Sequence, residues 1–459
     1  MSSEPTPPGQ GRASRPKPGT EIELTAGPLA HGGAAVCRHE GFVVFAQGAV
    51  PGDRVRAVLG KVKRSHAEAR VVEVLEAGPD RIEPVADHPG APWQILNYDA
   101  QLAAKQDMVE QALSRLGHFD NVEVAKIVPA DQQWRYRNKL EFSFGTADDG
   151  SIACGFHAPG RWDVVEPLDT CLLGSERADK VRKAALDWCV AEGLEPFDRR
   201  THTGYLRNLV VREGINTGDM QVRLVTSEGE LPNAIEFGEA VDCEGVFHTE
   251  IEGSGETTVG GSLSIISGQS KLMEEISGLT VGISPEAFFQ TNTLMAEKLY
   301  AMAAEEAALK GHERLFDLCS GIGTIGLAMS PRAGEVWGLE IVEPAVEDAI
   351  ENAKMNGITN ATFFAGDVRR DMRELVERAG KPDTIVVDPP RAGLSGKIIR
   401  RIGEAGAKRI VYVSCNPTTL APNAAALGEL GYDLIKVRPI DLFPQTPHVE
   451  CVALLQRRA

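Results

Sequence analysis

Strands and helices alternate regularly through the last third of the chain, and this alternation constrains the fold more than any other feature. From Arg314 onward, apolar runs such as RLFDL, EVWGLE, TIVVD and RIVYVS are separated by segments with helical character. Such alternation predicts a mostly parallel sheet with helices on both faces. Ligands of open sheets of this kind bind beside the carboxyl ends of the strands. We therefore expect functional residues where these strands end.

A glycine-containing turn follows the first of these strands. Glycines let the backbone approach a ligand closely at the start of a helix. Glu340 ends the next strand, where a carboxylate either caps a turn or accepts hydrogen bonds from both ribose hydroxyls of a nucleoside cofactor. No Lys-Ser/Thr follows the turn, so the pattern favours an adenosine cofactor such as S-adenosylmethionine or NAD over a Walker phosphate loop. The turn contains Cys319, Gly321, Gly323 and Thr324.

Three further strand ends carry side chains suited to chemistry. Asp388 precedes two prolines, which form a stiff turn, and Arg391 stands where amino methyltransferases place an aromatic residue. Cys415 is followed by a proline that favours the start of a helix, and a helix N-terminus can favour a thiolate. Glu450 lies in an apolar strand, where a carboxylate costs free energy unless it is paired or used. An inert buried thiol and a structural ion pair are the alternative explanations for Cys415 and Glu450.

The N-terminal part of the chain has short β-type runs cut by Gly and Pro turns. Residues 1–17 lack periodicity, and we expect a disordered tail there. The following runs predict a small β-barrel. They are Glu21–Leu24, Phe42–Phe45, Arg54–Leu59 and Ala69–Leu75. Basic residues of the barrel are suited to a groove that follows RNA phosphates, although a solvated strand face explains the same run. The candidate RNA contacts are Arg54, Arg56, Lys61, Lys63 and Arg64.

The middle of the chain begins with a helix, which the apolar spacing and closing glycine of Asp99–Gly117 predict. From Val122 to Gly282, Val-, Phe- and Leu-rich runs alternate with turns and predict an antiparallel α+β domain. Its segment WRYRNK interleaves aromatic and basic side chains, which suits the stacking of bases and the binding of phosphates. A strand with one aromatic face in the core explains the same letters. The candidate RNA contacts here are Arg135, Arg137 and Lys139.

Composition and charge limit the class of protein. The 459 residues are 42% hydrophobic and 25% charged, which is typical of globular proteins and excludes wholesale disorder. A net charge of -17 argues against general affinity for polyanions but permits one basic domain. Apolar runs are too short to span a membrane, no signal peptide is evident, and the eight cysteines are scattered. We therefore expect a cytoplasmic protein with reduced thiols and no membrane partner, and we assume a monomer.

Taken in order, these motifs closely resemble the uracil-5 RNA methyltransferase family. The matching motifs are Phe289-Gln290-Thr291-Asn292, DLCSGIGTIGLA, DPPRAGL, VSCNPTTLA and the terminal HVECV. The resemblance is close over residues 280–459 and weaker elsewhere: residues 20–77 look like the RNA-binding barrel called TRAM, and YRNKLEF resembles the middle domain of the family. It implies an α/β fold, with a Rossmann-like class I methyltransferase domain preceded by an OB-like barrel and an α+β domain.

Domain boundaries follow from this resemblance. We expect a TRAM barrel over residues 18–78, a central RNA-binding domain from 79–94 and 122–279, and a catalytic domain from 95–121 and 280–459.

The resemblance also implies a reaction, the S-adenosylmethionine-dependent methylation of C5 of a uridine in RNA. C5 of uracil is a poor nucleophile, so a thiolate must first add to C6, and Cys415 matches that nucleophile. Glu450 matches the general base that removes the C5 proton. The target uridine has to be unstacked, which costs least in a loop. The matching cofactor-binding positions are Gln290, Cys319, Gly321, Gly323, Thr324, Glu340, Asp367 and Asp388.

Many members of the family hold an iron-sulfur cluster with four cysteines, and this chain departs from that pattern. Aligned on Gln94, three of the cysteine positions are replaced, and only Cys171 remains. One thiolate cannot hold a four-iron cluster, so we expect none. The replacements are Ile82, His88 and Ala91. Smaller departures are Cys319-Ser320 and Thr324 in the glycine turn, and Pro422-Asn423 after VSCNPTTLA.

The barrel favours ribosomal RNA, the 23S molecule in particular, with transfer RNA as the alternative, because bacterial transfer-RNA enzymes of the family generally lack it. A 5-methylcytosine RNA methyltransferase shares addition at C6, but it carries a cysteine in the turn after the fourth strand, which DPPRAG lacks. A catalytically silent RNA-binding or assembly factor is an alternative of a different class, against which the presence of both Cys415 and Glu450 argues.

Overall fold

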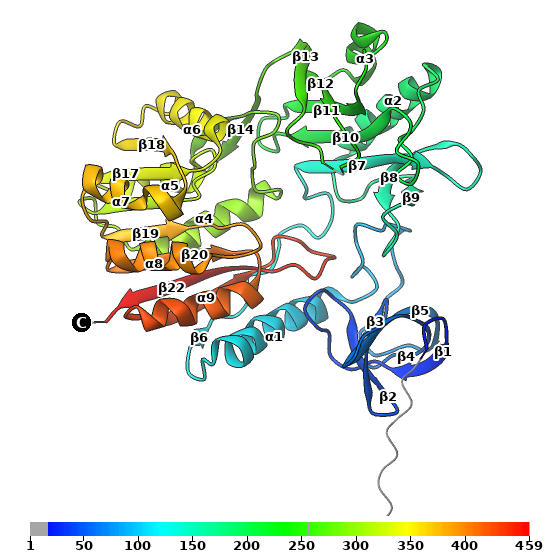
Figure 1. Cartoon of the computed structure of the whole chain (residues 1–459), viewed down its shortest axis with the longest axis horizontal. Coiled ribbons are helices and arrows are strands. Elements are labelled where there is room, and N and C mark those ends of the chain that lie inside the picture. The colour runs from blue at the N-terminus through cyan, green and yellow to red at the C-terminus, as the bar shows by residue number, and fades with distance from the viewer. Residues whose placement is uncertain (1–16, 256, 459) are drawn as a thin grey trace, which may run out of the picture. The chain divides into compact units, whose positions relative to one another are not determined.

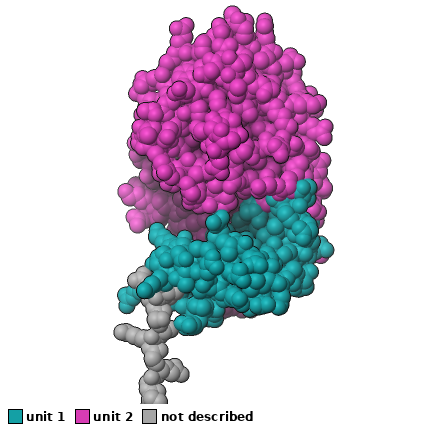
Figure 2. Space-filling view, turned by 90° about the vertical axis from the view of Figure 1, so that its right-hand side faces the viewer, with its two compact units in different colours: residues 1–85, 92–104, 445–447 teal, residues 86–91, 105–444, 448–459 magenta. Residues whose placement is uncertain are grey.

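The computed structural model describes residues 17–255 and 257–458, so the expected disordered tail lies almost wholly outside the described residues. The chain forms two compact units, coloured teal and magenta in Figure 2. The first unit contains the described residues up to Val85 together with residues 92–104 and 445–447. The second contains residues 86–91, 105–444 and 448–459. Segments that are distant in the sequence therefore contribute to each unit.

The first unit is built on a five-stranded sheet with the order β1-β4-β5-β3-β2, consistent with the small barrel predicted from the sequence. Along β4, Val55, Ala57 and Leu59 are buried, while the residues between them are partly exposed, as period-two alternation requires. The sequence predicts four of the strands and misses β2, whose apolar run is very short. The strands are β1 (Glu21–Thr25), β2 (Ala35–His39), β3 (Phe42–Gln47), β4 (Arg54–Val62) and β5 (His66–Glu76).

A seven-stranded sheet forms the middle part of the second unit, in the order β13-β12-β11-β10-β7-β8-β9. The prediction of an antiparallel sheet is wrong for one pair: β11 and β12 are parallel, because helix α3 connects them as a crossover. The strands are β7 (Lys139–Thr146), β8 (Ile152–His157), β9 (Val165–Pro167), β10 (Leu206–Glu213), β11 (Met220–Ser227), β12 (Gly245–Ile251) and β13 (Ser262–Gly268). The helices are α2 (Glu176–Ala191) and α3 (Ala234–Val241).

The last part of the second unit is an eight-stranded sheet with the order β18-β17-β16-β19-β20-β22-β21-β6. Strands β16 to β20 are parallel, as predicted, and β22 is inserted antiparallel between β20 and β21. The strand order reverses between β16 and β19, which is where such sheets bind ligands. The strands are β6 (Glu123–Val124), β16 (Arg314–Leu318), β17 (Glu335–Glu340), β18 (Ala361–Ala365), β19 (Thr384–Val387), β20 (Arg409–Ser414), β21 (Tyr432–Ile440) and β22 (Glu450–Arg457).

Helices cover both faces of this sheet, which confirms the predicted α/β class. Figure 1 shows α7, α8 and α9 side by side, whereas α4 contacts β19, β20 and β22. The hairpin β14 (Leu272–Ile276) and β15 (Leu279–Ile283) precedes α4. Among the described residues, no helix combines the length and apolar character that crossing a membrane requires. The helices are α1 (Tyr98–Gly117), α4 (Thr293–Ala307), α5 (Thr324–Met329), η1 (Ser330–Arg332), α6 (Glu343–Met355), α7 (Val368–Ala379), α8 (Gly396–Ala405) and α9 (Pro417–Glu429).

A buried ion pair within the second unit connects α1 to the segment after β21. Lys105 Nζ donates to Asp441 Oδ1 at 2.6 Å and to the carbonyl oxygen of Phe443 at 3.0 Å. Both charged side chains are fully buried. Since neither charge has access to water, each depends on the other for compensation.

We expect Lys105→Met to lower the free energy of unfolding by about 3–5 kcal/mol, because it leaves the Asp441 carboxylate buried without its countercharge. Chemical denaturation monitored by circular dichroism measures the loss, and Lys105→Met/Asp441→Leu should recover part of it. Lys408→Met, which breaks the exposed pair with Asp383, is the matched control and should change stability little. Equal effects of the two single substitutions would contradict this account.

Candidate active site

The glycine turn connects β16 to α5 and has an unusual backbone. Cys319, Gly321 and Gly323 have φ angles of 61°, 53° and 85°, in the region that favours glycine. A Cβ atom on Gly323 would lie 2.9 Å from the ring of Phe363, so a side chain does not fit there. The amide of Gly321 donates to Glu340 Oε2 at 3.0 Å. The turn therefore packs against Phe363 of β18 and is held by Glu340 at the end of β17, which agrees with the alternative that Glu340 caps a turn; ribose binding by Glu340 remains a prediction.

Four carboxylates near the carboxyl ends of these strands raise the pKa of the Cys319 thiol. Burial is the main cause that raises the pKa of Cys319 to about 12, and the four negative charges raise it further. Burial likewise raises the pKa of Asp317 to about 7 and that of Asp388 to about 6. The arrangement concentrates negative charge, which favours a cationic ligand. The four are Asp317, Glu340, Asp367 and Asp388.

Two buried polar atoms at this location lack a partner among the described residues: Asp317 Oδ1 and Ser320 Oγ. Buried polar atoms are normally hydrogen-bonded, so these two are available to a ligand. Neither residue was among the predicted cofactor contacts, two of which already have partners: the Thr324 hydroxyl lies 3.1 Å from that of Tyr300, and Asp367 accepts from Arg369 Nε at 2.8 Å. The donors and charges of the site therefore fit an adenosine cofactor with cationic groups, such as S-adenosylmethionine.

Gln290 reaches the same site from the loop before α4. Its Nε2 donates to Asp388 Oδ2 at 3.2 Å. Asn138 holds this loop, because its Nδ2 donates to the Gln290 carbonyl oxygen at 2.8 Å and to Thr293 Oγ1 at 2.9 Å. Its backbone amide also donates to the carbonyl oxygen of Thr291 at 2.8 Å. This role could not be predicted, since Asn138 lies within WRYRNK and its partners are about 150 residues away.

Cys415 and Glu450 lie close together at the edge of the sheet. The antiparallel register of β20 and β22 pairs Ser414 with Cys451, so Cys415 directly follows one strand and Glu450 begins the other. Glu450 is 3% exposed, and burial, followed by the charge of Asp388, raises its pKa well above the ordinary value. Arg391 is the nearby positive charge that lowers the pKa of both Glu450 and Cys415. The structure thus brings the two predicted catalytic residues together.

The thiol of Cys415 is protonated at neutral pH in this state. Burial, followed by the charges of Glu450 and Asp388, raises its pKa to about 12. The expected start of a helix is present, with Asn416 capping α9, yet the pKa of the thiol is raised. Asn416 Nδ2 also donates to the Arg391 carbonyl oxygen at 3.1 Å, which joins two strand ends. A thiolate therefore requires an additional positive charge or a proton acceptor at the site.

One departure from the family pattern has a structural role. Asn423 Oδ1 accepts from the amide of Leu394 at 2.7 Å and from the Tyr412 hydroxyl at 2.9 Å. Asn423 therefore holds the end of the DPPRAGL turn, which carries Asp388 and Arg391.

Three of the five candidate basic residues of the barrel form ion pairs with acidic side chains. Arg54 pairs with Glu23 and Glu76, Arg56 with Glu73, and Lys63 with Glu68. All of these pairs are exposed to solvent, and such pairs exchange readily with other ligands. Lys61 and Arg64 make no ion pair within the described part of the chain. The RNA-binding role of these five residues remains a prediction.

The side chains of the segment WRYRNK are more buried than those of an exposed RNA-binding surface. Tyr136 is 4% exposed, which agrees with the alternative in one respect: its aromatic ring lies in the core, but the residue precedes β7 and is not part of a strand. The guanidinium of Arg137 lies 5.8 Å from the ring of Phe443, and Lys139 pairs with Glu141 at 18% exposure of its side chain. Arg135 donates to the carbonyl oxygen of Gly174. RNA contacts from Arg135, Arg137 and Lys139 remain predictions, and each would compete with these protein contacts.

At the predicted remnant of a cluster site, His88 Nε2 lies 3.5 Å from Cys171 Sγ, and both residues are buried. Burial lowers the pKa of His88 to about 4, so the imidazole is neutral. Within residues 17–255 and 257–458, no three His, Cys, Asp or Glu residues are grouped so that they could bind a metal ion. The expectation that the protein lacks a cluster remains a prediction.

Comparisons with known proteins agree with this geometry. Residues 279–458 match the family described as tRNA (uracil-5-)-methyltransferase. An uncharacterised RNA methyltransferase of Chlorobaculum tepidum is 36% identical over 445 residues, covering 91% of this chain and 92% of that protein. Another, from Caldanaerobacter subterraneus, is 37% identical over 429 residues, covering 91% of this chain and 94% of that protein.

A solved structure is also similar over nearly the full length. It is that of the Pyrococcus abyssi tRNA (uracil-54, C5)-methyltransferase in complex with S-adenosyl-L-homocysteine. The sequences are 26% identical, the TM-score is 0.78, and the match covers 94% of this chain and 99% of that one. The similarity therefore extends well beyond the eight-stranded sheet.

Asp388→Asn should stabilise the ligand-free protein at alkaline pH. Folding raises the pKa of this carboxyl to about 6, so the folded state loses stability as pH rises through that value and the carboxylate forms. The substitution removes this cost, which we put at about 1–3 kcal/mol above pH 7. Thermal unfolding at pH 5 and pH 8 measures it, since the gain should be larger at pH 8. Asp149→Asn is the control and should show the opposite sign, because hydrogen bonds from Ser151 lower the pKa of Asp149.

Asn138→Ala should weaken binding of S-adenosyl-L-homocysteine by about 3- to 10-fold, because each lost hydrogen bond contributes about 1 kcal/mol to holding the Gln290 loop. Isothermal titration calorimetry of the folded variant measures the affinity. Asn208→Ala is the matched control, since Asn208 is also buried in the middle sheet but donates to Ser143 Oγ. Equal losses of affinity in the two variants would indicate general destabilisation instead of positioning.

Proposed function

Since the chain belongs to the uracil-5 RNA methyltransferase family, we propose that Cys415 and Glu450 carry out the methylation of C5 of a uridine in RNA. The supporting observation is their juxtaposition at the end of β20 and the start of β22, beside Asp388. Gln290 and Asp388 are joined by a hydrogen bond, so the cofactor-binding and nucleophilic residues form one site. The S-adenosyl-L-homocysteine bound by the Pyrococcus abyssi enzyme is the product form of the cofactor that we assign to this site.

In the proposed reaction, the thiolate sulfur of Cys415 forms a bond to C6 of uracil. The electron pair of the C5–C6 double bond then makes C5 nucleophilic. S-adenosylmethionine, when bound, supplies a methyl group on a sulfonium centre. After C5 is methylated, the Glu450 carboxylate accepts the C5 proton, the C5–C6 double bond forms again, and the bond to Cys415 Sγ breaks. The thiolate is regenerated, and Glu450 is left protonated.

The charges of the site support this division of roles. Glu450 is a strong base for a carboxylate because burial raises its pKa, which suits it to remove a proton from carbon. Cys415 needs a lower pKa than it has in the ligand-free state, and Arg391 is the chain's own group that acts in this direction. A cation bound beside Asp388 would act in the same direction, which would couple formation of the thiolate to occupancy of the site.

For the substrate we propose ribosomal RNA, the 23S molecule in particular, with transfer RNA as the alternative. The five-stranded N-terminal sheet supports an RNA-binding barrel. The match to a transfer-RNA enzyme covers 94% of this chain, so the barrel by itself is weak support for one class of RNA over the other. Methylation of unmodified total RNA with labelled cofactor, followed by separation by size, assigns the class.

We expect 5-fluorouridine-substituted RNA to trap the protein covalently, because fluorine at C5 cannot leave as a proton. A denaturation-resistant adduct should form with the wild type and not with Cys415→Ala, while Cys243→Ala is the cysteine control that should still be trapped. Glu450→Gln should lower turnover about 10²- to 10⁴-fold and accumulate a methylated adduct on ordinary RNA. Mass spectrometry of the adducts measures each outcome. An absence of adducts with cofactor binding intact would favour the silent RNA-binding alternative.

A further inference from the structure

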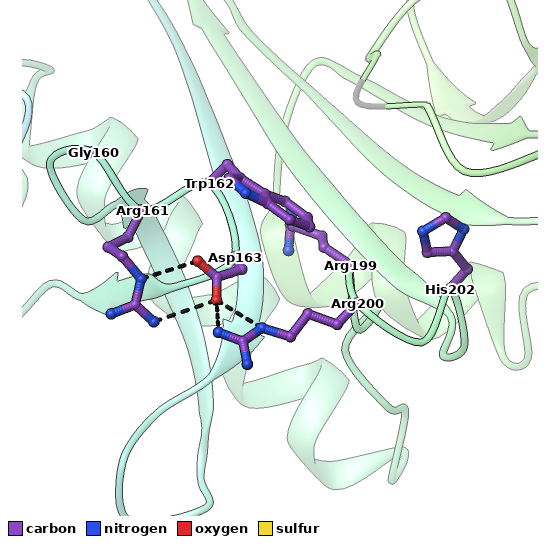
Figure 3. Close-up of a pocket in the computed structure, with 7 residues that line it drawn as sticks. All are labelled: Gly160, Arg161, Trp162, Asp163, Arg199, Arg200 and His202. Atoms are coloured by element: carbon purple, nitrogen blue, oxygen red, sulfur yellow. Dashed lines mark hydrogen bonds and ion pairs between the residues drawn. The ribbon is translucent and has the colours of Figure 1, made fainter. Parts of the chain in front are cut away.

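The hairpin that joins β8 to β9 presents an exposed tryptophan beside arginine side chains (Figure 3). These residues line an open hollow of about 570 Å³ on the middle sheet of the second unit. Trp162 is 61% exposed, although burial of a tryptophan side chain would gain free energy. None of the lining residues belongs to the candidate active site. An exposed indole beside guanidinium groups provides a face on which a base can stack and donors that can bind a phosphate.

The local sequence holds Trp162 outward. Pro159 and Gly160 are the central residues of a turn in which the Arg161 amide donates to the Ala158 carbonyl oxygen at 2.9 Å. Gly160 has a φ angle of 75°, as the third residue of a type II turn requires. The Ala158 amide also donates to the carbonyl oxygen of Val164 at 2.9 Å, which closes the hairpin. The tip is therefore an ordered structure that presents the indole to solvent.

Asp163 organises the charges of the hollow. Its carboxylate, 7% exposed, accepts from Arg161 Nε at 3.1 Å and from Arg200 Nε at 2.8 Å, and Figure 3 shows the two guanidinium groups converging on it. Hydrogen bonds from these arginines hold the pKa of Asp163 well below its usual range, so it stays ionised. Asp198 is a second carboxylate close to Arg200, whose backbone amide donates to Asp198 Oδ1 at 2.7 Å. The Arg161 and Arg200 side chains remain 56% and 67% exposed, with donors directed at solvent.

A third arginine, Arg199, also lines the hollow. Arg199 is 6% exposed, and its Nη1 donates to the carbonyl oxygen of Phe144 at 2.7 Å. The hollow therefore combines a flat aromatic face with the exposed guanidinium groups of Arg161 and Arg200, in a chain whose net charge is -17. A base stacks on such a face whatever its identity, and a phosphate accepts hydrogen bonds from two adjacent guanidinium groups.

We propose that this hollow binds a single-stranded segment of the RNA substrate, with one base stacked on Trp162 and a neighbouring phosphate bound by Arg161 and Arg200. The inference rests on the proposed function, because it adds a contact for the RNA of that same reaction. Single-stranded RNA is the matching form, since the bases of a duplex are already stacked on each other and cannot reach the indole. The site lies outside the residues that act on uracil, so it contributes affinity for RNA and not chemistry.

The test is binding of a fluorescein-labelled 15-nucleotide oligoadenylate to the full chain, measured by fluorescence anisotropy. This probe contains no uracil, so its binding is independent of the reaction at Cys415. We expect Trp162→Ala to weaken binding about 5- to 100-fold and Trp162→Phe to retain most of the affinity. Arg200→Gln should reduce the slope of log affinity against log salt by about 0.7, the value for one phosphate contact on a single strand.

Arg373→Gln is the matched control, because Arg373 is similarly exposed at 65% and also pairs with a surface carboxylate, that of Glu404. It should leave oligoadenylate binding unchanged. Unchanged binding in Trp162→Ala, no measurable binding by the wild type, or an equal loss on a fully paired RNA duplex would each overturn the proposal. Loss of oligoadenylate binding in Trp162→Ala without covalent trapping by the wild type would support the hollow as an RNA site while refuting the uridine chemistry.

Discussion

Several carboxylates are buried at one edge of the eight-stranded sheet, and the free energy that their burial costs is the constraint on which the candidate active site depends. Asp317, Asp388 and Glu450 all have raised pKa values, and burial is the leading cause for each. The positive charge of Arg391 opposes the effect at Glu450. Such a group destabilises the folded protein unless the rest of the structure compensates, and proteins retain such groups where they serve function. A cationic ligand recovers this free energy on binding, because it compensates the buried negative charges. The recovered free energy increases the affinity for that ligand.

Topology explains why two residues 35 positions apart can share one substrate. Strand β22 runs antiparallel to β20, so its first residue lies at the edge where β20 ends. At that edge, Cys415 directly follows the last residue of β20, and Glu450 is the first residue of β22. Had β22 continued the parallel order of β16 to β20, Glu450 would lie at the opposite edge, a full strand length away. The antiparallel direction of β22 among the described strands of this sheet is therefore what places the proposed nucleophile and the proposed base beside each other.

Much of this site was predictable because strand ends are local features. The glycine turn, Glu340, Asp388, Cys415 and Glu450 each follow or begin an apolar run, and parallel topology then brings them to one edge. The positioning role of Asn138 was not predictable, since it depends on contacts with a loop about 150 residues away. The raised pKa of Cys415 was missed for a related reason. The effect of a helix N-terminus can be predicted from sequence, whereas the extent of burial is set by the whole fold.

The middle sheet shows that composition alone does not distinguish a binding surface from a core. The segment WRYRNK is rich in aromatic and basic residues, yet Tyr136 is buried and Lys139 is paired with Glu141. The short GRWD sequence at the tip of the β8–β9 hairpin is less conspicuous, yet it exposes an indole. The difference is packing: Tyr136 lies in the segment before β7 and belongs to the hydrophobic core of the middle sheet, whereas Trp162 lies at a hairpin tip with no such cover. Aromatic side chains in a segment that packs on the core are therefore covered by the fold, and one at a tip stays exposed.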